Sequence, residues 1–182
     1  MPLSTIDNVL VVYNKLQRRN VCLRACRTPD KRRVVAAWAL YEDMSNALPR
    51  KGWEPPASPF PHPFEIVPIE CKGRGMLATR EIKKGEIIVC ERPIIIVPKY
   101  SSSEDGRQPW TEAEKYMLQL VYWLEQDDRE KFVQLHNCKP PRSCAPLMGI
   151  VRTNSFGVST HTMESSTDYC AVCLNISYVN HR

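Results

Sequence analysis

The glycines of this sequence gather where a main chain could come close to a small molecule. Three of the seven glycines fall between Gly73 and Gly85, and Gly73 and Gly75 stand on either side of Arg74. Because glycine has no β-carbon, it permits a positive φ and lets a ligand approach the main chain. Paired glycines are more often found in a tight hairpin turn. The pair therefore predicts a turn, and it leaves a binding role open.

Eight cysteines are the other residues with evident chemistry. Cys170 and Cys173 form a Cys-x-x-Cys pair, which invites zinc or redox chemistry. A structural zinc site needs four ligands, and no histidine stands at zinc-finger spacing from this pair or from Cys22 and Cys26. We therefore predict structural cysteines and no metal site, with a zinc-binding protein kept as the third hypothesis. The sequence has no secretory signal, so reduced thiols are expected.

The glycine pair opens a longer pattern that resembles the beginning of a SET domain, the fold of protein-lysine methyltransferases. The residues that carry this likeness are Gly73, Gly75, Ala78, Ile82, Lys84, Gly85, Glu86, Ile88, Glu91 and Pro93. A second block, residues 171–181, is similar to the family segment that contains an Asn-His pair. Between the blocks, Thr153, Asn154 and Phe156 are similar to an element of the SET-and-MYND subgroup.

This resemblance implies S-adenosylmethionine as the cofactor and a protein lysine, in a histone or another protein, as the substrate. In the family, main-chain groups at the paired glycines hold the amino-acid part of the cofactor, and the Asn-His pair lies near its amino group and adenine. A lysine amine has a pKa of about 10.4, so the enzyme must bury it in its neutral form. The cofactor-binding residues implied are Lys72, Gly73, Arg74, Gly75, Asn154, Asn180 and His181.

No catalytic residue can be carried over from the family. In the family, the sequence continues beyond the Asn-His pair to a tyrosine that lines the channel for the substrate lysine, whereas this sequence ends at Arg182. Tyr116, Tyr122, Tyr169 and Tyr178 are present, but none of the four stands in that context. We therefore expect a C-terminally truncated SET domain with negligible methyl transfer.

The expected fold class is α+β. Apolar residues at helical spacing predict helices over residues 4–19 and about 28–47, so residues 1–48 would form a basic helical hairpin. Six prolines at positions 49–63 predict a linker and a domain boundary. Residues 64–182 would form the partial SET domain, with a helical insert at about 110–156. The expected strands of that domain are residues 64–70, 76–79, 86–90, 94–97 and 169–179.

The positive charge belongs to the N-terminal segment. Residues 1–52 carry ten Lys and Arg against four Asp and Glu, whereas the whole chain has a net charge of +5. The alternative function is therefore an interaction module that binds a protein or nucleic acid through basic helices. A solvated helix face explains the same charges. With 43% hydrophobic residues and no apolar run that could span a bilayer, we expect a nuclear or cytoplasmic protein, neither secreted nor bound to a membrane.

Overall fold

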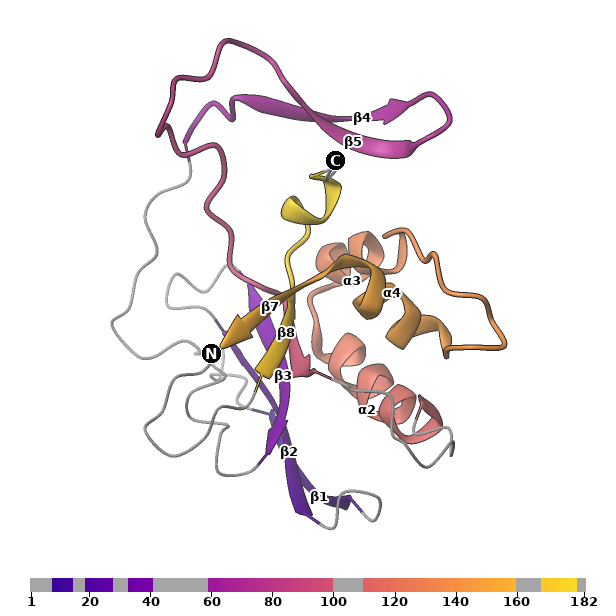
Figure 1. The fold of residues 1–182 in the computed structure, drawn as a ribbon. Coiled ribbons are helices and arrows are strands. Elements are labelled where there is room, and N and C mark those ends of the chain that lie inside the picture. The colour runs from indigo at the N-terminus through magenta and orange to yellow at the C-terminus, as the bar shows by residue number, and fades with distance from the viewer. Residues whose placement is uncertain are drawn as a thin grey trace.

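The computed structural model describes residues 8–14, 19–27, 33–40, 59–99, 110–159 and 168–179. A six-stranded sheet with the order β1-β2-β3-β6-β8-β7 forms the centre of the molecule, and a separate two-stranded sheet pairs β4 with β5. Helices α2, α3 and α4 lie together on one side of the large sheet (Figure 1). The fold is therefore a mixture of helices and strands, as expected.

The N-terminal helical hairpin predicted from the sequence is wrong for the residues that the structure describes. Three antiparallel strands stand there instead, β1 (Asn8–Asn14), β2 (Arg19–Arg27) and β3 (Val34–Leu40). The rest of residues 1–48 lies outside the described ranges. The run Val9–Tyr13 is rich in β-branched and aromatic residues, which favour strands. This preference, rather than the helical spacing of a few apolar residues, decides the local structure.

Burial on both faces of β3 explains why its sequence resembles a helix. Alternate residues, from Val34 through Ala36 to Trp38, pack into the core beneath the helices. The residues between them, Val35 and Ala37, belong to a second apolar cluster. A strand covered on both sides has no polar alternation, so its apolar run cannot be distinguished from a buried helix by periodicity.

The large sheet joins segments from both sides of the proline-rich region. Strand β6 (Ile95–Pro98) pairs parallel with β3 and antiparallel with β8 (Asp168–Val172), and β7 (Ser155–Ser159) pairs with β8. The expected strand at 94–97 is thus confirmed within one residue. The domain boundary at 49–63 stays a prediction, because residues 49–58 lie outside the described ranges.

Three helices occupy the region where a helical insert was expected. They are α2 (Trp110–Trp123), α3 (Gln126–Val133) and α4 (Pro146–Asn154). The ring of Trp38 on β3 meets the ring of Tyr116 on α2 edge-on, with 4.9 Å between ring centres. Such aromatic contacts add to the burial energy and fix α2 against the sheet. None of the described helices is long and apolar enough to cross a bilayer.

The glycine-rich segment forms the small sheet. Strands β4 (Phe64–Ile69) and β5 (Gly73–Ala78) make an antiparallel hairpin that pairs Val67 with Gly75. It lies above the large sheet in Figure 1, next to the C-terminal end of the described chain. The strand expected at 86–90 is wrong, because a turn at 84–85 is followed by residues that belong to no strand.

The last described segment is only partly a strand. The expected strand at 169–179 ends at Val172 as β8, and the chain then forms a short 3-10 helix, η2 (Ile176–Tyr178). This change of structure redirects the chain from the large sheet towards the β4–β5 hairpin, where the yellow ribbon ends in Figure 1.

Candidate functional site

The glycine pair stands at the start of β5, directly after a tight hairpin turn at residues 70–72. Gly73 has a φ of 75°, which is costly for residues with a β-carbon, and Cys71 also has a positive φ. The main-chain N–H of Lys72 donates to the carbonyl of Ile69 at 3.0 Å and closes the turn. The side chains of Lys72 and Arg74 are exposed, whereas Gly75 is buried. The sequence therefore places one exposed cation in the turn, Lys72, and one on β5, Arg74, with no side chain at the buried position 75.

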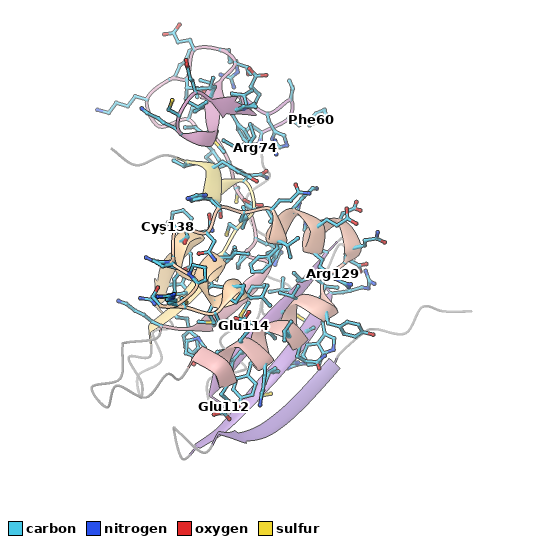
Figure 2. The ribbon with its side chains drawn as sticks, turned by 90° about the vertical axis from the view of Figure 1, so that its right-hand side faces the viewer. Phe60, Arg74, Glu112, Glu114, Arg129 and Cys138 are labelled. Carbon is cyan, nitrogen blue, oxygen red and sulfur yellow. The ribbon has the colours of Figure 1, made fainter. Side chains whose placement is uncertain are left out.

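This hairpin meets the end of the second motif block. Strand β5 and η2 lie side by side, and the guanidinium carbon of Arg74 is 5.6 Å from the centre of the Tyr178 ring. Figure 2 shows Arg74 where the hairpin approaches the yellow C-terminal segment. The structure thus brings together the two parts of the sequence from which the site was predicted.

Asn180 and His181 lie outside the described residues, and they follow directly after Val179, the residue that ends η2. The contacts of Asn180 and His181 are therefore not described. What the structure places beside the hairpin is the segment that leads into them.

The hairpin has features that fit a ligand with hydrogen-bonding groups. Within the described ranges β5 pairs only with β4, so its other edge carries main-chain N–H and C=O groups that no neighbouring strand takes. A β-carbon built on Gly73 would meet no atom within 4 Å. Main-chain donors, an open glycine and a nearby arginine suit the amino and carboxylate groups of an amino-acid ligand.

Asn154, which was also predicted to bind the cofactor, has a structural role. Its amide nitrogen donates to the carbonyl oxygens of His136 and Ile150, both at 2.7 Å. The hydroxyl of Ser177 donates to the Cys173 carbonyl and shares this hydrogen with the main-chain oxygen of Asn154, at 3.3 Å. Asn154 thus ties the end of α4 to η2, and its amide hydrogens are already engaged within the protein.

The carboxylate of Glu91 holds the start of η2. Its side chain is 4% exposed, and its Oε2 accepts from the main-chain N–H groups of Asn175 at 2.8 Å and Ile176 at 3.1 Å. The first N–H groups of a helix have no partner within it, and a carboxylate satisfies them well. Sequence reasoning found Glu91 only as a member of the family pattern and assigned it no role.

Arg33 connects this carboxylate to the helices. Its Nη1 is 3.6 Å from Glu91 Oε1, and its Nε is 3.9 Å from Asp128 Oδ2 on α3. Asp128 is buried. Arg33 is one of the ten basic residues counted in residues 1–52, and its contact with Glu91 could not be found from the sequence because the two residues are distant in the chain.

The turn around Gly85 is held by a second ion pair. Gly85 has a φ of 87°. Glu86 Oε2 accepts from the main-chain N–H of Lys83 at 3.1 Å, and Oε1 pairs with Arg80. The hydrogen bond from Arg80, followed by that from Lys83, lowers the pKa of the Glu86 carboxyl. The Lys-Gly-Glu pattern therefore shapes a turn and starts no strand.

The described tyrosines whose side chains can be placed lie in different surroundings. Tyr169 is fully buried in the sheet. Burial, with a hydrogen bond to Glu112, raises the pKa of Tyr116 to about 12. The exposed ring of Tyr122 lies 5.6 Å from the guanidinium carbon of Arg129. Only Tyr178 lies beside the hairpin.

The Cys-x-x-Cys pair lies at the end of β8. Cys170 is partly buried, Cys173 is buried, and both are free thiols. Burial, and then the nearby charge of Glu91, raises the pKa of Cys173 to about 12, so it is neutral at physiological pH. Within the described part of the chain, no three His, Cys, Asp or Glu side chains are grouped to hold a metal ion.

The basic residues of the N-terminal segment are partly engaged with acidic side chains. Arg27 pairs with Glu125 at 2.7 Å, in addition to the contacts of Arg33. A hollow of about 500 Å³ lies here, and it contains none of the predicted cofactor residues. The residues that line it are Arg27, Arg33, Glu125, Gln126, Asp127, Asp128 and Lys131.

Comparison with known families gives one result. The model of the SET domain matches residues 73–182, which is more than half of the chain. Searches of curated proteins and of solved structures found no match. The match begins at Gly73, the first residue of β5, and covers both the hairpin strand and η2. The likeness to the SET-and-MYND subgroup stays a prediction. The chain therefore belongs to the SET-domain family, which is in general a family of lysine methyltransferases that use S-adenosylmethionine.

Proposed function

We propose that this protein binds S-adenosylmethionine between the β4–β5 hairpin and the segment that follows η2, and that its function is related to protein-lysine methylation. The observation that carries the proposal is the contact of Arg74 with Tyr178, which joins the two motif blocks. Lys72, Gly73, Arg74 and Gly75 form one side of the site, and Asn180 and His181 form the other. Asn154 acts by supporting η2 through Ser177.

The bound cofactor would supply an electrophilic methyl group, which a neutral lysine amine of a substrate protein attacks. The residues of this chain bind and orient the cofactor. The exposed cations Lys72 and Arg74 favour its carboxylate, and the unpaired edge of β5 offers main-chain hydrogen bonds. The negligible methyl transfer expected from the sequence stays a prediction.

Isothermal titration calorimetry of the chain with S-adenosylmethionine and S-adenosylhomocysteine tests the binding. Gly75→Val places a branched side chain at the buried position of β5 and is expected to weaken binding at least about tenfold, because the main chain can no longer approach the ligand. Gly157→Val on β7 is the matched control. A β-carbon there meets no atom within 4 Å, so binding should be unchanged.

Two outcomes would contradict the proposal. A folded wild-type chain that binds neither ligand at millimolar concentration has no cofactor site. Transfer of a radioactive methyl group to protein lysines by residues 1–182 would disprove the predicted lack of activity, although it would support the cofactor site.

The interaction-module alternative stays a prediction. Its expected helices are absent from the described residues, and nothing in the described contacts favours nucleic acid over a solvated surface.

A further inference from the structure

The start of η2 depends on one buried carboxylate. Glu91 Oε2 accepts both the Asn175 and the Ile176 N–H groups. Its other oxygen, Oε1, is buried and has no hydrogen-bond partner within the described ranges. A buried carboxylate with an unsatisfied oxygen is costly unless a charge of opposite sign lies near it. The guanidinium of Arg33, 3.6 Å away, supplies that charge.

The 3-10 helix η2 has few contacts within itself that could hold it in place. It has three residues, and none of them is fully buried. Its own main-chain bonds are short-range, such as those from Tyr178 to Asn175 and from Val179 to Ile176, both at 3.0 Å. Its position is therefore set by contacts from outside, namely Glu91 at its start, the main-chain oxygens of Cys173 and Asn154 at the Ser177 hydroxyl, and Arg74 at its end.

Arg33 lies outside the family match, which begins at residue 73. It directly precedes β3, and it contacts both Glu91 and Asp128 of α3. The guanidinium of Arg33 thus connects the N-terminal part of the large sheet to α3 directly and to η2 through Glu91.

We propose that Glu91 and Arg33 are positioning residues for cofactor binding, and this inference rests on the function proposed above. Glu91 holds the N-terminus of η2, and Arg33 orients the Glu91 carboxylate. Together they determine where η2 stands relative to Gly73 and Gly75 on β5. The N-terminal strands would then contribute to the methyl-donor side of the site without touching the ligand.

The variants Glu91→Gln, Arg33→Met and Arg33→Lys test the two roles in the full chain. Arg27→Met is the matched control, because Arg27 lines the same hollow but pairs with Glu125. Hydrogen exchange of the Asn175 and Ile176 amides measures how firmly η2 is held. Calorimetry with S-adenosylhomocysteine measures the consequence for binding, and thermal unfolding shows that each variant is folded.

We expect Glu91→Gln to speed exchange at these two amides about tenfold and to raise the Kd for S-adenosylhomocysteine by a similar factor, as the loss of a charged hydrogen bond predicts. Arg33→Met should produce smaller changes in the same direction. Arg33→Lys should restore part of both, because it keeps the charge. Arg27→Met should leave exchange and Kd within about twofold of the wild type.

Unchanged amide exchange in Glu91→Gln would overturn the proposal at its first step. Faster exchange with an unchanged Kd would overturn the role in cofactor binding. If the wild-type chain binds no cofactor, the proposed function fails and this role fails with it. The exchange rates then still show whether Glu91 and Arg33 hold η2, so the two failures can be told apart.

Discussion

The guanidinium of Arg74 lies over the ring of Tyr178, and this contact joins the β4–β5 hairpin to η2. One residue belongs to the glycine-rich block and the other to the last described segment. Because the hairpin is not part of the large sheet, this contact is one of the means by which it is docked to the rest of the protein.

Replacing both members of this contact should reveal their coupling. In a double-mutant cycle with Arg74→Ala and Tyr178→Leu, we expect a coupling free energy of about 0.5–1 kcal/mol, as for an exposed cation–π pair. Urea unfolding followed by circular dichroism measures it. Tyr122→Leu, which removes the ring at the same 5.6 Å from Arg129, should leave S-adenosylhomocysteine binding unchanged. Additive effects of the two replacements would show that the contact contributes nothing.

A carboxylate from α2 caps helix α4. Glu114 accepts from the main-chain N–H groups of Leu147 at 2.9 Å and Met148 at 3.0 Å. We expect Glu114→Ala to lower the free energy of unfolding by about 1–2 kcal/mol, because these two donors lose their partner. Asp127→Asn removes an exposed carboxylate from the first turn of α3 and should change stability by less than about 0.5 kcal/mol. Equal effects of both variants would contradict the capping role.

The thiols should differ strongly in reactivity. Cys138 is exposed, and its hydrogen bond with the hydroxyl of Thr153, at 3.4 Å, lowers its pKa. Because the thiolate is the reactive form, Cys138 should be labelled by a disulfide reagent at pH 7 before the buried Cys173. Mass spectrometry identifies the order, and Thr153→Val should slow labelling at Cys138. Early labelling of Cys173 in the folded chain would contradict its burial.

Stability should fall as the pH rises above 9. The pKa of Cys173 is raised from 9.0 to about 12 in the folded state, so the unfolded chain loses this proton first and is favoured between pH 9 and 12. The expected loss from this thiol is about 1 kcal/mol by pH 10. Urea unfolding at pH 8 to 10 measures it. Cys173→Ala should reduce the slope, whereas the exposed Cys71→Ala should not. Burial also raises the pKa of Cys22, which leaves a residual slope.

The sequence by itself determined the family and most of the elements between residues 64 and 154. The glycine pair, the Asn-His pair and the Glu-x-Pro pattern are short motifs that can be read directly from the sequence. The family match to residues 73–182 agrees with them. Helices α2, α3 and α4 were predictable because their apolar spacing and starting residues are also local properties. The strand expected at 64–70 corresponds to β4, and the one expected at 76–79 overlaps the end of β5.

The tertiary structure decided the rest. Strand β3 is buried on both faces, so its sequence carries no alternation that could distinguish it from a helix, and only its pairing with β2 and β6 shows what it is. The link from Arg33 to Glu91 and from Glu91 to η2 joins three distant segments. Because such contacts depend on how the sheet brings those segments together, no local pattern in the sequence could indicate them.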